Sequence, residues 1–125
     1  EKDITSHEAQ YKNDDASIYK KLIFVPQDIP YLESQKVRFK FRNVTSTAAC
    51  DAGIIIGGRW GSMNEFTNLI DMGKVVGVLK GTGGVADELE ELNNKIKKEG
   101  SGKVIFNSSP KELVEKIIHE LSSKA

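Results

Sequence analysis

Four short apolar runs mark the chain, and each is continuous rather than alternating with polar residues. They lie at residues 22–25, 54–56, 75–79 and 104–106. Continuous apolar runs of this length are typical of strands that are covered on both faces of a parallel sheet. Pro26 closes the first run, because proline cannot donate a hydrogen bond to a strand ladder. The pattern therefore predicts a mostly parallel sheet of about four strands.

The segments between the later runs carry apolar residues at helical spacing. One helix is expected to begin at Ser62 and to end at Gly73, and a second begins near Val85. The last helix opens with a capping box at Ser109, with Pro110 at its first position. Alternating strands and helices imply right-handed crossovers with helices packed on the sheet. The fold class predicted from this order is α/β.

The first part of the chain does not follow this alternation. Residues 1–20 are polar and hold few large apolar side chains, so we expect a polar, irregular N-terminal segment there. Residues 21–125 then form the α/β domain. The chain opens at Glu1 rather than at a methionine, which we interpret as a cut end.

Composition narrows the class of protein without naming a function. The 125 residues include 18 Lys+Arg and 18 Asp+Glu, so no net field draws the chain toward nucleic acid or a membrane. The single cysteine, Cys50, excludes an internal disulfide and a cysteine-based zinc site. No apolar run approaches the roughly 20 residues of a membrane span. We expect a cytoplasmic protein with no membrane partner.

The run at 54–56 ends at paired glycines, and this is the most informative stretch of the chain. Gly57 and Gly58 are followed by Gly61 and by the expected helix start at Ser62. A strand, a glycine turn and a helix start together direct backbone N–H groups at an anion. The stretch predicts a site for a nucleoside monophosphate or a similar phosphorylated small molecule.

A second glycine-rich stretch follows the run at 75–79. Its sequence is Gly81-Thr82-Gly83-Gly84, and it stands at the carboxyl end of an expected strand. Open α/β sheets bind ligands at that edge, which favours a role in binding. Glycines also favour a flexible turn without any ligand, and the sequence leaves both interpretations open.

Residues 42–65 resemble the Lonely Guy (LOG) family, long described as possible lysine decarboxylases. Arg42-Asn43 falls on the family's Arg-Lys or Arg-Asn pair, Asp51 on its aspartate, and residues 57–65 on its Pro-Gly-Gly-x-Gly-Thr-x-x-Glu motif. The resemblance implies the C-terminal half of a Rossmann-like, three-layer α/β/α protein. It also implies a homodimer that hydrolyses the N-glycosidic bond of nucleoside monophosphates, whereas true lysine decarboxylation is not expected.

The resemblance also assigns roles to residues. It makes Arg42 and Glu65 catalytic, with Glu65 contacting the ribose, where a carboxylate can stabilise an oxocarbenium-like centre or activate water. The expected nucleotide- and phosphate-binding residues are Asn43, Gly57, Gly58, Arg59, Gly61, Ser62, Thr82 and Gly83. Three positions depart from the family motif: Gly57 replaces proline, Arg59 replaces glycine and Ser62 replaces threonine. Arg59 can either bind the phosphate or obstruct the substrate.

The sequence is also compatible with roles other than catalysis. Ser62-x-x-Glu65 is itself a capping box, so Glu65 could serve only the helix start. The protein could bind or sense a nucleotide without chemistry. The basic stretch at 36–42 could bind single-stranded nucleic acid, although it is a small footprint in a neutral chain. For His7 and His119 we expect no acidic or metal-ligand company of the kind that a catalytic site needs, so neither is a good catalytic candidate. We expect no metal and no cofactor.

Overall fold

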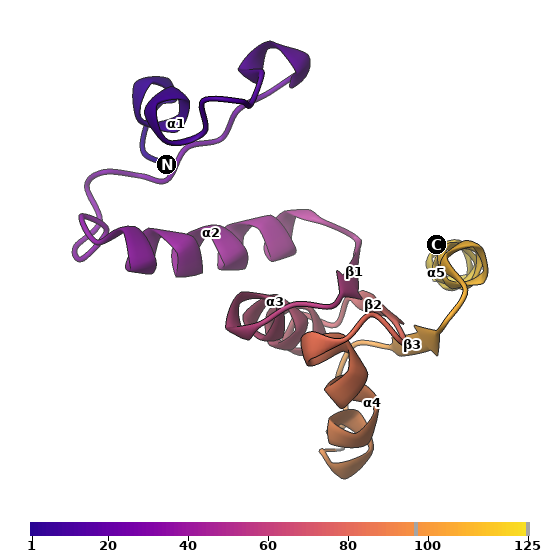
Figure 1. The fold of residues 1–125 in the computed structure, drawn as a ribbon. Helices are drawn as coiled ribbons and strands as arrows, with labels where there is room; N and C mark the ends of the chain where they lie inside the picture. Colours follow the sequence, from indigo (N-terminus) through magenta and orange to yellow (C-terminus); the bar gives the residue numbers. More distant parts are fainter. Residues whose placement is uncertain (97, 125) are drawn as a thin grey trace. The chain divides into compact units, whose positions relative to one another are not determined.

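The computed structural model describes residues 1–96 and 98–124. The chain divides into two compact units, residues 1–42 and residues 43–125, and each is considered by itself. The long helix α2 (Gln35–Ala49) runs from the first unit into the second. Figure 1 shows the order of the elements along the chain.

A parallel sheet forms the centre of the second unit (Figure 1). Its strands are β1 (Ala52–Ile56), β2 (Val75–Leu79) and β3 (Val104–Asn107), in the spatial order β1-β2-β3. All pairs are parallel, with Ala52 opposite Val75 and Val76 opposite Val104. The carboxyl ends of all three strands therefore lie at the same edge.

Helices cover both faces of this sheet. The helices α3 (Trp60–Asp71) and α4 (Gly84–Lys95) pack on one face, where the buried core is Ile55, Phe66, Leu69, Val76, Val78, Ala86 and Leu89. The helix α5 (Pro110–Ser123) packs on the other face, where Leu113 and Ile117 bury Val75. Ser109 caps α5 as expected, because its Oγ accepts from the amide of Glu112 at 3.3 Å. The three-layer α/β fold with a parallel sheet is confirmed.

The first apolar run, at residues 22–25, does not form a strand. The amide of Val25 donates to the carbonyl of Glu1 at 3.1 Å instead of joining a ladder, and Ile23 is 79% exposed. The following Pro26 has no amide hydrogen with which to extend pairing. The described residues therefore hold a three-stranded sheet, and the expected fourth strand is wrong.

The first unit contains more regular structure than its polarity suggested. Helix α1 (Ile4–Gln10) and a 3₁₀ turn at Ala16–Ile18 lie within residues 1–20, which were expected to be irregular. Asp3 caps α1, because its Oδ1 accepts from the amide of Ser6 at 2.8 Å. Capping side chains supply hydrogen bonds that hydrophobic periodicity does not register. A domain boundary near residue 20 stays a prediction.

None of the helices in the described part of the chain is long and apolar enough to cross a membrane.

Candidate functional site

The glycine turn at residues 57–58 connects β1 directly to α3. Gly57 and Gly58 have φ values of +54° and +94°, in the left-handed region that side chains rarely adopt. A Cβ on Gly58 would collide with the side chain of Ser62, so the Ser62 hydroxyl lies against the turn. The paired glycines let the chain reverse abruptly at the carboxyl edge of the sheet.

Helix α3 begins at Trp60, two residues before the predicted start at Ser62. Arg59 is its N-cap residue and makes no side-chain capping bond. Ser62 therefore lies inside the first turn, and its interpretation as the capping residue of a Ser-x-x-Glu box is wrong. Glu65 therefore does not form a capping box with Ser62.

The first turn of α3 has backbone amides to spare. The amide of Met63 is the first to join the helix, donating to the carbonyl of Arg59 at 3.0 Å. Within the described residues, the amides of Gly58 through Ser62 donate to no protein atom. A Cβ on Gly61 would meet nothing within 4 Å, so the space above this turn is open. Free amides at the positive end of a helix dipole favour an anion.

The second glycine-rich turn packs directly against the first. The amides of Val85 and Ala86, at the start of α4, donate to the carbonyls of Gly58 and Gly57 at 2.9 and 3.0 Å. In return, the amide of Gly57 donates to Thr82 Oγ1 at 2.8 Å. The sequence separated these turns by more than twenty residues, and the parallel sheet brings them together.

Two amides of the second turn, those of Gly81 and Gly83, have an acceptor within the protein. Asp87 accepts from the amide of Gly81 through Oδ1 at 2.7 Å and from that of Gly83 through Oδ2 at 3.0 Å. Sequence reasoning gave Asp87 no role. A signal was available, because an aspartate a few residues after a glycine turn is well placed to bond its amides.

Glu65 lies on α3, more than one turn after its start, and Asn43 lies on α2. Glu65 is half-buried and lines a cavity of about 210 Å³, together with Thr47 and Cys50. Asn43 is 3% exposed, and its Nδ2 donates to Asn64 Oδ1 on α3 at 3.1 Å. Asn43 thus joins α2 to α3, and its own Oδ1 has no hydrogen-bond partner among the described residues.

Arg42 ends the first unit, whereas the glycine turn and Glu65 belong to the second. Its side chain is exposed, and its guanidinium carbon lies 4.9 Å from the ring centroid of Phe39, a cation–π distance. Arg59 and Trp60 are also exposed, Trp60 by 80%. The catalytic role expected for Arg42 stays a prediction.

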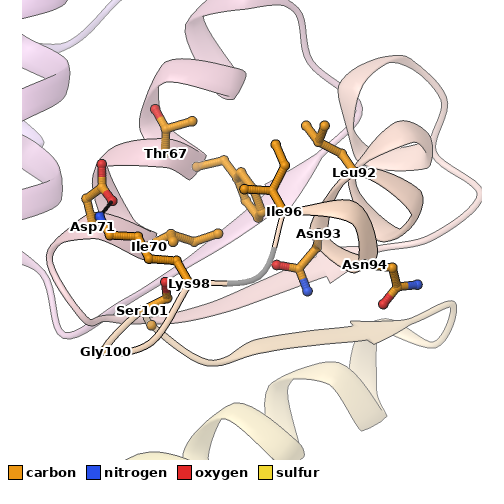
Figure 2. Close-up of a pocket in the computed structure, with 12 residues that line it drawn as sticks. Thr67, Ile70, Asp71, Leu92, Asn93, Asn94, Ile96, Lys98, Gly100 and Ser101 are labelled. Carbon is orange, nitrogen blue, oxygen red and sulfur yellow. Dashed lines mark hydrogen bonds and ion pairs between the residues drawn. The ribbon is translucent and has the colours of Figure 1, made fainter.

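A cavity of about 470 Å³ opens elsewhere, between α3, α4 and the segment before β3 (Figure 2). Phe66, Ile70, Leu92 and Ile96 give it an apolar lining, and an ion pair of 3.0 Å between Asp71 and Lys98 crosses its rim. It lies toward the amino ends of the strands, because its lining includes residues that precede β3. None of the predicted site residues lines it.

His7 has an acidic neighbour after all. Its Nε2 lies 2.7 Å from Asp14 Oδ2, and the Tyr19 hydroxyl donates to Asp14 Oδ1 at 3.0 Å. The hydrogen bond from His7, followed by that from Tyr19, lowers the pKa of Asp14. The expectation that His7 lacks acidic company is therefore wrong. Even so, the described residues hold no group of three His, Cys, Asp or Glu side chains placed to bind a metal.

Together, the parallel sheet, the helices on both faces and the glycine turn at the carboxyl edge define a Rossmann-like α/β protein. The chain belongs to the SLOG cluster4 family, which it matches over residues 28–114. No curated protein matches it.

The X-ray structure of TM1055, a structural-genomics target, has a similar fold. It has a TM-score of 0.55 with this chain and 24% sequence identity. The match covers 65% of this chain and 49% of TM1055, so the chain matches about half of that protein's length.

Proposed function

We propose that this protein binds a nucleoside monophosphate, with the phosphate at the N-terminus of α3. The observation that carries the proposal is the row of backbone amides from Gly58 to Ser62 that have no acceptor within the described residues. Membership of the SLOG cluster4 family and the expected LOG-like relationship support a nucleotide as the source of that phosphate.

Two side chains can add to the backbone site. The hydroxyl of Ser62 lies against Gly58 and can donate a further hydrogen bond to a phosphate oxygen. The exposed guanidinium of Arg59 stands at the same turn and can form charge-assisted bonds. In this arrangement Arg59 recognises the phosphate rather than obstructing it.

The binding site is tested by isothermal titration with AMP, GMP, CMP and UMP. Gly61→Val places a branched side chain in open space above the free amides, so the variant should fold but bind about tenfold more weakly. Thr67→Val, two turns along the same helix and exposed, is the matched control and should bind normally. If Gly61→Val binds as tightly as the parent, the phosphate site lies elsewhere.

We further propose that the site cleaves the N-glycosidic bond of the bound nucleotide, as its LOG-like residues suggest. Glu65 would stabilise positive charge on the ribose or activate water, and the LOG resemblance makes Arg42 the second catalytic residue. Release of free base, measured by chromatography, distinguishes this activity from nucleotide binding or sensing without chemistry. Arg42→Ala should then weaken binding, because it removes a cation that the resemblance assigns to the nucleotide.

Self-association would complete the apolar surface of the second unit. Ile54 and Ile56 of β1 are 43% and 62% exposed, and Val114 and Ile118 of α5 are 42% and 57% exposed. In the register, Ile54 pairs with Gly77, which packs under Ile117, so β1 presents these isoleucines on the face that α5 covers. We propose a homodimer that buries this surface, and light scattering of Ile56→Glu against the parent chain tests it.

A further inference from the structure

The hydroxyl of Thr82 joins the ends of two neighbouring strands. It donates to the carbonyl of Leu79, the last residue of β2, at 2.7 Å. It also accepts from the amide of Gly57, the first residue after β1, at 2.8 Å. A hydroxyl has a single hydrogen to donate, so the bond to Leu79 fixes its lone pairs for the Gly57 amide. Thr82 thereby holds the first residue of the glycine turn.

Asp87 holds the loop that carries Thr82. Its two carboxylate oxygens accept from the amides of Gly81 and Gly83, on either side of Thr82. Asp87 itself lies in the first turn of α4, where a negative charge is favourable. A carboxylate that bonds two loop amides takes the place that an external anion would occupy. The amides of Gly81 and Gly83 are thus already bonded to the protein's own carboxylate.

We propose that Thr82 and Asp87 are positioning residues for the anion site on α3 and do not touch the ligand. Asp87 shapes the Gly81–Gly84 loop and excludes anions from it. Thr82 holds the Gly57 amide by a hydrogen bond. The free amides therefore begin at Gly58 and keep one orientation toward the ligand. This proposal rests on the proposed function only in identifying those free amides as the phosphate site.

The role differs from a general contribution to folding. The amides of Val85 and Ala86 dock the two turns through the carbonyls of Gly58 and Gly57, and neither bond involves Thr82. Loss of the Thr82 hydroxyl should therefore leave the turns in contact and the fold intact. Its specific effect should be to release the Gly57 amide and to loosen the free amides that follow it.

The test compares Thr82→Val, which keeps the shape but removes the hydroxyl, with Thr82→Ser, which keeps the hydroxyl. Amide hydrogen exchange of the ¹⁵N-labelled full chain, without ligand, should become about tenfold faster at Gly57 in Thr82→Val and normal in Thr82→Ser. The affinity for AMP should fall about fivefold to tenfold in Thr82→Val and recover in Thr82→Ser. Thr67→Val is the control, and Thr82→Ala replaces Thr82→Val if that variant does not fold.

Asp87→Asn tests the second part. In the parent chain, AMP should shift the amide resonances of Gly58 through Ser62 and leave those of Gly81 and Gly83 in place. In Asp87→Asn, exchange at Gly81 and Gly83 should accelerate, because the neutral amide is a weaker acceptor and offers only one oxygen. An AMP-induced shift at Gly81 or Gly83 in the parent chain that matches those at Gly58–Ser62 would overturn the exclusion of anions from this loop.

The outcomes separate the two proposals. If AMP shifts no amide of the parent chain, the proposed function fails, while the exchange of Gly57 still decides the role of Thr82. Normal Gly57 exchange in Thr82→Val, or a Thr82→Ser variant that behaves like the valine, overturns the positioning role even where AMP binds.

Discussion

The two glycine-rich turns have similar sequences, but their backbone amides have different hydrogen-bond partners. Each follows a parallel strand and precedes a helix, at the same edge of the same sheet. The amides of Gly58 through Ser62, at the first turn, have no acceptor within the described residues. At the second turn, Asp87 accepts from the amides of Gly81 and Gly83, and the first turn accepts from those of Val85 and Ala86.

The comparison shows that glycine content does not define an anion site. What distinguishes the turns is the destination of each backbone amide, since every buried or crowded N–H must find an acceptor. Amides that bond the protein itself hold a turn in shape, whereas amides that lack an acceptor can bind an anion. In any strand–glycine–helix motif, the acceptor of each backbone amide must therefore be identified before an anion site is assigned.

The largest expected effect is on base release, if the site at the first turn cleaves nucleotides. Glu65→Gln keeps the size of the side chain and removes its charge, so base release should fall by about 10²–10⁴ while AMP still binds. Glu91→Gln is the control, because Glu91 is exposed on α4 and pairs only with Lys95 among the described residues. The assay is chromatographic detection of free base.

Unchanged base release by Glu65→Gln would remove Glu65 from the reaction and leave the fold assignment untouched. Loss of AMP binding in the same variant would instead make Glu65 a binding residue. Either result would change the role assigned to Glu65 and would give the second turn no part in catalysis.

The contact between the turns is tested by a pair of glycine variants. A Cβ on Gly84 would overlap the backbone of Gly58, whereas a Cβ on Gly81 would meet nothing within 4 Å. Both have positive φ, so each alanine should lose about 1–3 kcal/mol to backbone strain. Gly84→Ala should lose a further 1–3 kcal/mol, roughly, to overpacking. Urea unfolding of both variants measures the difference, and equal stabilities would show that the turns do not depend on their contact.

The sequence predicted the part of this architecture that repeats along the chain. Continuous apolar runs identified β1, β2 and β3, and helical spacing identified α3, α4 and α5. Residues 22–25 look like another such run, but an apolar run does not record whether a neighbouring strand exists to pair with it. Here the amide of Val25 bonds Glu1 instead.

The site was predictable only in outline, for a physical reason. The position of Gly57 and Gly58 after a strand indicated a turn at the carboxyl edge, and the structure has one there. The bonds from Gly57 to Thr82 and from Gly83 to Asp87 depend on three-dimensional packing and side-chain orientation. Local spacing favoured a Ser62 cap, whereas the strand-to-helix reversal starts α3 earlier, at Trp60.

The smallest expected effect concerns Asp14, a carboxylate outside both turns. Its protonation should change only its own hydrogen-bond partners. Asp14 bonds His7 and Tyr19 in the first unit, and these bonds lower its pKa below the ordinary 3.8. Because this pKa is lowered, the ionised carboxylate stabilises the folded segment at pH values above its ordinary pKa. This contribution is lost as the pH falls through the folded-state pKa. The side-chain NMR resonances of His7 and Tyr19 should change together at that pH, and Asp14→Asn should abolish the step. The amides of Gly58 through Ser62 should be indifferent to Asp14→Asn at neutral pH, because no hydrogen bond of this network involves the turn. A shift of those amides in Asp14→Asn would show that the anion site responds to a change in the first unit.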